Sequence, residues 1–302
     1  MKEMLGENNE YGVITENSEQ ALYHGIKKLL DNPHMLTYYR KRAKEREDIF
    51  AQSRRLWLWK KCLKGLWGKD EVDFAGMCVW RSKSRKFYAS LVALQREMSR
   101  CGYETIYAFP EKARDKVWCR QLAQSQRVYF LPEAKARILP KTYQILRRIY
   151  KENHVQIVHS HFELYDIPAT VTAPRGTKVF WHLHDPLNIK KDLRGILWRI
   201  QYGMIGKRAQ LLSATDFYKD LVIGLGFPKA QARTIINCID TSRIQCNPRA
   251  TPEFDFLTFG WDFYRKGDDV IIQACDRLHQ EGFHFKLLLN GNEQTWHVLD
   301  EF

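Results

Sequence analysis

The chain has 302 residues, and its 44% hydrophobic and 27% charged residues are typical of a globular protein. No apolar run approaches the roughly 20 residues of a membrane-spanning helix, and the seven cysteines contain no CxxC pair, so we expect a cytoplasmic protein with reduced thiols. The net charge of +13 is spread along the chain and favours phosphorylated substrates, anionic lipid or nucleic acid without choosing among them.

Residues 1–69 are predicted to be helical. The stretch SEQALYHGIKKLLDNP begins at Ser18, a capping residue, and stops at a proline, while MLTYYRKRAKEREDIF predicts a second, charged helix. Next comes RRLWLWKKCLKGLWGKD, in which apolar residues from Leu56 to Trp67 share one helical face among lysines. This stretch predicts either peripheral contact with an anionic membrane or packing of the tryptophans against the next domain, and the two interpretations carry equal weight.

Residues 70–250 alternate strand patterns with helical ones, which predicts a parallel, doubly wound α/β sheet. The strand patterns cover 72–80, 103–109, 127–132, 155–162, 177–185, 209–215 and 232–239. The helical patterns cover 87–102, 137–154, 164–173, 189–208 and 216–226. Ligands of such sheets bind at the carboxyl ends of the strands, which here carry His159, His161, His182, His184 and Asp185.

Residues 251–302 begin a second alternating unit after the proline-bearing linker QCNPRATPE. Strands are predicted over 254–260 and 283–292, with a helix over 268–282 between them. One strand–helix–strand cannot cover both faces of its own sheet. We therefore expect this unit either to dock on the preceding segment or to be part of an incomplete domain.

The basic group RKGDD lies where a predicted strand gives way to a helix. Two cations, Arg265 and Lys266, together with helix amides and the permissive Gly267 form a seat suited to a diphosphate. The same residues are also typical of a solvated turn in which Asp268 or Asp269 caps the next helix, and such Lys-Gly-Asp turns are common. Taken alone, this stretch favours the turn.

The stretches HSHF and WHLHD each place two histidines on one face of a strand. Three interpretations are open: core histidines bonded to backbone, a metal site, or a hydrogen-bonding pair of His184 and Asp185 facing a sugar or phosphate. The metal is the weakest of these because no Cys or Glu stands at ligand spacing. Dehydrogenase, P-loop, serine hydrolase and zincin motifs are absent from the sequence.

In order, these pieces resemble glycosyltransferase family 4, retaining enzymes whose GT-B fold has two facing Rossmann-like lobes. The motifs VQIVHSHF and VFWHLHD resemble two strand ends of the first lobe. LLSATDFYKDLVIGLGFPKAQARTIINCID resembles the end of that lobe, while FLTFGWDFYRKGDDVIIQACDRL and KLLLNGN resemble the start of the second. The resemblance implies transfer of a sugar from a nucleotide-sugar to a glycan or lipid-linked acceptor, as in cell-surface polysaccharide synthesis, with no metal and no cofactor. We expect no nucleic-acid partner, because the sequence contains no nucleic-acid recognition motif.

The resemblance also implies residue roles. His184 would act as the catalytic residue facing the sugar. The donor diphosphate would be held by Arg265, Lys266, Gly267 and Gly260. Further residues of the cleft would be His161, Asp185, Asn237 and Glu3. Three positions depart from the family pattern, because Trp261 replaces an arginine, Cys238 replaces a glycine, and the basic RSKSRKF replaces a glycine-rich loop.

The layout departs further, because residues 1–50 resemble the closing part of a second lobe. The expected domains are thus 1–69, the end of one glycosyltransferase module with a linker; 70–250, the first lobe of the next module; and 251–302, the start of its nucleotide-sugar lobe. Two hypotheses follow for such a fragment: a hexosyl-type glycosyltransferase, or a non-catalytic basic module that binds anionic lipid or a protein partner.

Overall fold

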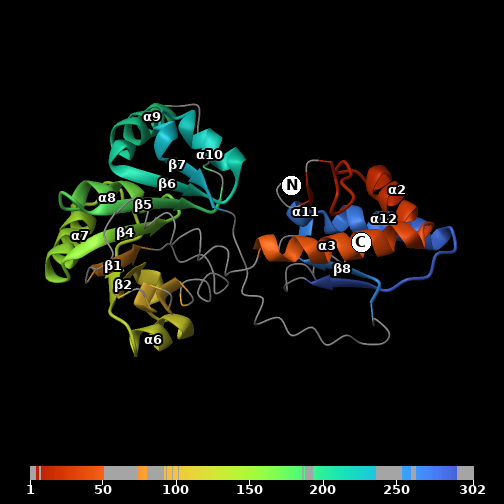
Figure 1. Ribbon diagram of the computed structural model, residues 1–302, viewed down its shortest axis with the longest axis horizontal. Coiled ribbons are helices and arrows are strands. Elements are labelled where there is room, and N and C mark those ends of the chain that lie inside the picture. The colour runs from red at the N-terminus through yellow and green to blue at the C-terminus, as the bar shows by residue number, and fades with distance from the viewer. Residues whose placement is uncertain are drawn as a thin grey trace. The chain divides into compact units, whose positions relative to one another are not determined.

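The computed structural model describes residues 5–6, 8–50, 74–79, 92, 94–96, 98–100, 102–185, 187, 193–235, 254–259 and 263–290. The chain forms two compact units (Figure 1). The large unit spans Phe50–Arg243, and the small unit joins Met1–Ile49 to Ile244–Phe302. Several predicted features lie outside the described residues, namely the amphipathic stretch Leu56–Trp67, the basic loop 81–87, Glu3, Asn237, Cys238, Gly260 and Trp261.

The large unit is built on a seven-stranded parallel sheet with the order β3-β2-β1-β4-β5-β6-β7. Its strands are β1 (Phe74–Val79), β2 (Tyr103–Pro110), β3 (Val128–Leu131), β4 (Val155–His161), β5 (Lys178–Leu183), β6 (Ala209–Ser213) and β7 (Ala232–Thr234). The order reverses between β1 and β4, as in Rossmann-like sheets. The predicted fold class, a doubly wound α/β sheet, is confirmed.

Helices connect these strands: α6 (Val117–Ala123), α7 (Pro140–Glu152), α8 (Asp166–Thr172), α9 (Leu193–Met204) and α10 (Asp216–Ile223). Short 3-10 turns lie at Glu111–Ala113, Gly206–Arg208 and Lys229–Gln231. Pro140 begins α7 rather than interrupting it, because the first helical position needs no amide proton. The sequence did not predict α6, which is seven residues long and has no side-chain cap.

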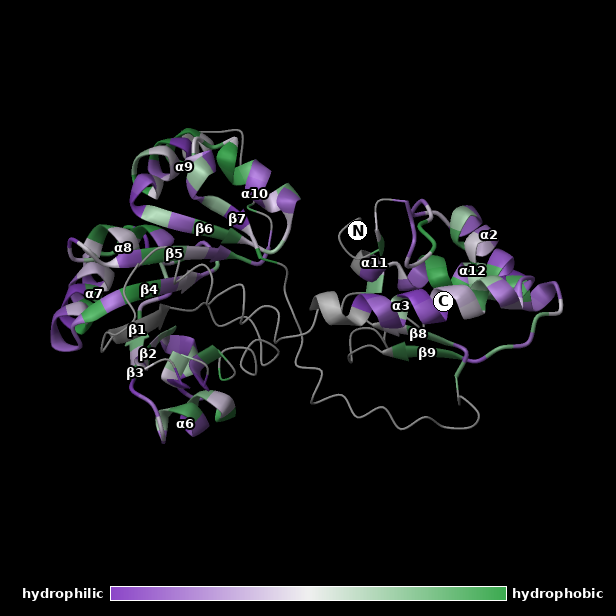
Figure 2. Ribbon diagram, viewed as in Figure 1, coloured by the Kyte–Doolittle hydropathy of each residue, from purple (hydrophilic) through white to green (hydrophobic). Residues whose placement is uncertain are grey.

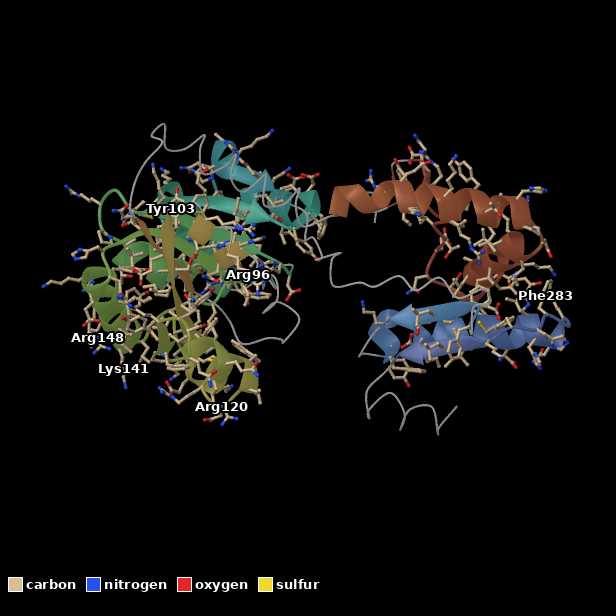
Figure 3. All side chains as sticks on the ribbon, turned by 60° about the horizontal axis from the view of Figure 1, so that its bottom comes forward. Arg96, Tyr103, Arg120, Lys141, Arg148 and Phe283 are labelled. Atoms are coloured by element: carbon tan, nitrogen blue, oxygen red, sulfur yellow. The ribbon has the colours of Figure 1, made fainter. Side chains whose placement is uncertain are left out.

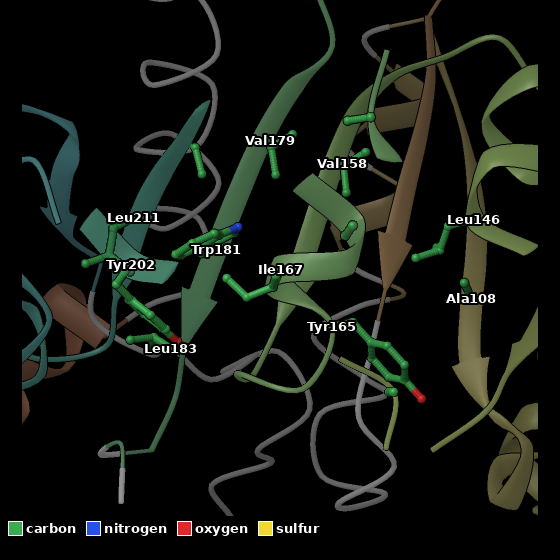
Figure 4. Close-up of a cluster of buried hydrophobic side chains, with 14 of the residues drawn as sticks. Ala108, Leu146, Val158, Tyr165, Ile167, Val179, Trp181, Leu183, Tyr202 and Leu211 are labelled. Carbon is green, nitrogen blue, oxygen red and sulfur yellow. The ribbon is translucent and has the colours of Figure 1, made fainter. Parts of the chain in front are cut away.

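One face of the sheet carries the main hydrophobic core (Figure 4). At its centre Trp181 of β5 is fully buried, with its ring edge-to-face on Tyr202 at a centroid distance of 5.0 Å. Its indole N–H donates to the Thr170 hydroxyl of α8 at 2.8 Å. This polar contact allows a tryptophan to lie in an apolar layer without an unsatisfied donor.

The opposite face of the sheet carries a smaller apolar cluster, which is made of Ile157, Phe180, Leu212 and Ile235. Leu94 and Met98, from the helical residues between 92 and 100, pack against it. Because side chains alternate along a strand, this same face continues beyond Ile157 and Phe180 into the histidines of β4 and β5.

The small unit contains α2 (Glu19–Leu30), α3 (Pro33–Phe50), α11 (Phe263–Lys266), α12 (Asp268–Gln280) and the parallel strands β8 (Phe256–Phe259) and β9 (Leu287–Asn290). Ser18 caps α2 by accepting from the amide of Ala21, as predicted. Hydrophobic and hydrophilic stretches alternate along the helices of both units (Figure 2). None of the helices in the described ranges is long and apolar enough to cross a membrane.

In the small unit, α2 packs along α12. Tyr23 is buried against Ala274 and Leu278. Lys27 Nζ lies 2.5 Å from Glu281 Oε2, and the Arg277 guanidinium stands 4.0 Å from the centre of the Tyr23 ring. The helix after β8 is therefore covered by a helix from the beginning of the chain, a packing that the sequence did not predict.

Candidate functional site

The candidate site lies where the strand order reverses, at the carboxyl ends of β4 and β5. His159 of β4 is in register with Cys78 of β1 on one side and with Phe180 of β5 on the other. His161, the last residue of β4, is in register with His182. Doubly wound sheets bind ligands at this point because the connections on either side diverge and leave a crevice.

Four histidines gather there as two cross-strand pairs. His159 Nε2 lies 3.1 Å from His182 Nδ1, and His161 Nδ1 lies 3.0 Å from His184 Nε2. The ring centroids of the two β4 histidines are 3.8 Å apart, and those of His182 and His184 are 4.1 Å apart. None of the four is more than 7% exposed. The spacing in HSH and HLH predicted a shared face, but not this pairing between strands.

Each pair limits the protonation of its rings. A hydrogen bond between two imidazoles needs one N–H donor and one nitrogen lone pair, so the two rings of a pair are not both protonated. In the pair of His161 and His184 this bond also fixes the orientation of both rings. The imidazole of His184, directly after β5, is therefore held in place by the hydrogen bond at its Nε2.

A left-handed residue shapes the turn after β4. Phe162 has φ 62°, a strained value for a bulky side chain. Its amide donates to the His182 carbonyl at 3.0 Å, and its ring centroid lies 4.9 Å from that of His184. The turn thus holds an aromatic ring against His184. No pattern in the sequence predicts this contact.

Beneath the turn, Ser160 donates from its hydroxyl to Asp166 Oδ1 at 2.7 Å. Asp166 opens α8 and is completely buried. Burial raises the pKa of its carboxyl to about 8, although the Ser160 hydrogen bond and the positive charge of Arg137 act in the opposite direction. The carboxyl is thus mainly protonated at neutral pH. Sequence reasoning missed Asp166, which looks like an ordinary first-turn acid.

The predicted diphosphate group lies in the small unit. Lys266 is exposed and ends α11, Gly267 adopts the left-handed region with φ 72°, and α12 begins at Asp268. The N-cap residue of α12 is Gly267, and among the described residues no side-chain cap, including one from Asp268 or Asp269, bonds to this helix start. Uncapped amides at the start of a helix are suited to an anion. Arg265 lies in α11, but its side chain, like Gly260, is outside the described residues.

The remaining predicted residues divide between the site and positions not described. Asp185 directly follows His184 and is exposed, whereas His184 is buried. The structure brings His161 and His184 together, and their roles in a cleft stay predictions. Asn237 and Glu3 lie outside the described residues, so their roles stay predictions.

The sheet order and the site at its reversal define a Rossmann-like α/β protein with a histidine-lined strand end. The sequence model of Glycosyltransferase Family 4 matches residues 89–243, just over half of the chain, and the chain belongs to this family. The predicted family is therefore confirmed.

Solved structures are also similar to the chain. A glycosyltransferase from Rickettsia africae ESF-5 is similar with a TM-score of 0.52 and 11% identity, over 76% of this chain and 71% of that one. MurG from Acinetobacter baumannii gives 0.42 and 11%, over 72% and 67%. Anabaena Alr3699/HepE, solved with UDP and glucose, gives 0.44 and 10%, over 71% and 68%. No curated protein matches the chain.

Proposed function

We propose that the chain transfers a hexosyl group, with retention, from a nucleotide-sugar to a glycan or lipid-linked acceptor of a cell-surface polysaccharide. His184 contacts the sugar. Lys266, Arg265 and the first amides of α12 bind the donor diphosphate, with Gly267 and Gly260 allowing close approach of the backbone. The proposal needs no metal ion or cofactor at the diphosphate, because fixed cations and helix amides neutralise it.

The observation that supports the proposal best is the fixed orientation of the His184 ring. His161 fixes it through a 3.0 Å bond at the carboxyl end of β5, beside the reversal of strand order. A buried ring with a fixed orientation can meet a substrate hydroxyl without reorganising during the reaction. Departure of a nucleoside diphosphate builds negative charge on its phosphates. The exposed Lys266 lies next to the start of α12 at Gly267, and it is suited to stabilise that charge.

The overall charge supports an anionic donor. Arg120, Lys141 and Arg148 are exposed at the surface of the large unit (Figure 3). Spread positive charge attracts anionic substrates and raises their rate of encounter. Peripheral contact with the inner face of a membrane through Leu56–Trp67 belongs to the same proposal, as does a cytoplasmic location.

The test is calorimetric titration of the full chain with UDP and with GDP. Lys266→Ala should weaken the binding of one nucleotide by about 10- to 100-fold, the loss of one charged hydrogen bond. The matched control is Lys286→Ala, an exposed lysine of the same unit that precedes β9. Equal affinities of wild type and Lys266→Ala would remove the diphosphate assignment. A chain that binds neither nucleotide and releases none from UDP- or GDP-sugars would support the non-catalytic basic module instead.

A further inference from the structure

We propose that His159, His161 and His182 bind one divalent transition-metal ion of the zinc type. This inference goes beyond the proposed function, in which the donor needs no metal. It concerns the strand histidines of the large unit alone.

The donor atoms are already close. One ligand nitrogen from each of the three rings lies within 4.8 Å of the other two. Zinc–imidazole bonds of 2.0–2.1 Å place two nitrogens of a tetrahedral site about 3.3 Å apart. His159 Nε2 and His182 Nδ1 are 3.1 Å apart, so this pair has the required separation.

The chemistry of the donors suits such an ion. Neutral imidazole is a preferred ligand of zinc, copper and nickel, and three histidines form a complete set that leaves a fourth position open. In the metal-free cluster one nitrogen of the His159–His182 contact carries the bonding proton. Binding of an ion by both nitrogens requires this proton to move to the other nitrogen of the same ring, which gives the second tautomer of a neutral imidazole. All three side chains are at most 3% exposed, and they come from two adjacent strands, so the sheet holds them in place.

His184 would act as the outer partner of the site. A histidine that binds metal through one nitrogen commonly donates its other N–H to a neighbour. His161 directs Nδ1 to His184 Nε2, so it would bind the ion through Nε2 and donate from Nδ1. His184 would then accept at Nε2 and carry its own proton on Nδ1. The ion would thereby fix the tautomer of His184.

The test uses the full chain, stripped with a chelator and titrated with Co²⁺ and then Zn²⁺. We expect one equivalent per chain, a visible Co²⁺ spectrum, and X-ray absorption of the Zn²⁺ form that shows nitrogen and no sulfur ligands. No binding at one equivalent, or sulfur in the ligand shell, would overturn the site. These readouts need neither substrate nor variant, so the metal site can fail while the Lys266 test succeeds.

Substitutions of the proposed ligands test which residues bind the ion. His159→Gln and His182→Gln should each weaken Zn²⁺ binding at least about 100-fold, and His184→Gln about 10-fold, as an outer partner does. The control is His154→Asn, an exposed histidine of the same unit at φ 46°, where asparagine is well tolerated. Wild-type affinity in both ligand variants, at unchanged circular dichroism, would overturn the assignment.

Discussion

Tyr23 and Glu281 lie 258 residues apart in the sequence, yet the tyrosine hydroxyl donates to Glu281 Oε1 at 2.5 Å. The Tyr23 ring is buried against Ala274 and Leu278 of α12. The two ends of the chain therefore share one hydrophobic core, and the stability of α12 depends on a helix made at the start of the chain.

Tyr23→Ala should release α12. Removing a buried aromatic ring costs about 3–5 kcal/mol, and here the cavity would form between α2 and α12. Hydrogen exchange of Asp268–Gln280 should accelerate, while exchange of β4 in the large unit stays unchanged. The control is Tyr38→Ala, because Tyr38 on α3 is 51% exposed. Unchanged exchange of α12 in Tyr23→Ala would show that α2 does not support it.

The buried Asp166 carboxyl should make the large unit less stable as pH rises. Its pKa is about 8 in the folded chain, raised by burial from 3.8, so between these values unfolding releases a proton. Rising pH then favours the unfolded state by up to about 1.4 kcal/mol per pH unit. Asp166→Asn retains an acceptor for Ser160 and has no such proton. Its free energy of unfolding relative to wild type should increase from pH 5 to pH 7 in urea titrations.

Asp220→Asn is the control for this prediction. Asp220 is an exposed acid on α10 of the same unit. Its substitution should leave the pH profile of unfolding as in wild type. The same profile in Asp166→Asn as in wild type would mean that the buried carboxyl does not carry the proton.

The hydrogen bond from the Trp181 indole to Thr170 should contribute to the free energy of unfolding of the large unit. Thr170→Val removes the acceptor at 2.8 Å and leaves a buried N–H without a partner, at a cost of about 1–3 kcal/mol. In Trp181→Phe this donor is absent, so adding Thr170→Val should cost less than it does in wild type. Urea unfolding of the four chains measures the coupling, and Val171→Ala, half-exposed on the same helix, should stay within about 0.5 kcal/mol of wild type. Additive losses would argue against the hydrogen bond.

His161 and His184 should act as one unit in catalysis. If His161 holds the His184 ring, then His161→Gln and His184→Gln each lower the rate of nucleotide release by about 100-fold, and the double variant is little slower than either. His154→Asn serves as the control. Multiplicative losses in the double variant would instead indicate independent roles.

Much of the local structure could be predicted from the sequence. Ser18 marks the start of α2, and the alternation of strand and helix patterns predicts a parallel sheet because consecutive parallel strands need a crossover. The histidine spacing placed both members of each motif on one face. These signals are local, since they depend on residues within a few positions of each other.

The remaining features depend on contacts between distant residues. Which histidine of β4 meets which of β5 depends on strand register, and a shift of two residues would pair His161 with a different ring. The φ of 62° at Phe162 has no glycine or asparagine to signal it. The pairing of Tyr23 with Glu281 was not predictable because many amphipathic helices could cover α12 equally well.

The contact between α2 and α12 also means that α2 is synthesised long before its packing partner. At 5–20 residues per second, the ribosome needs roughly 13 to 50 s to extend the chain across the 258 residues from Tyr23 to Glu281. Throughout that interval the apolar side of α2 has no partner from α12, while the strands of the large unit are already emerging. The core between α2 and α12 can therefore form only after the strands of the large unit have been made.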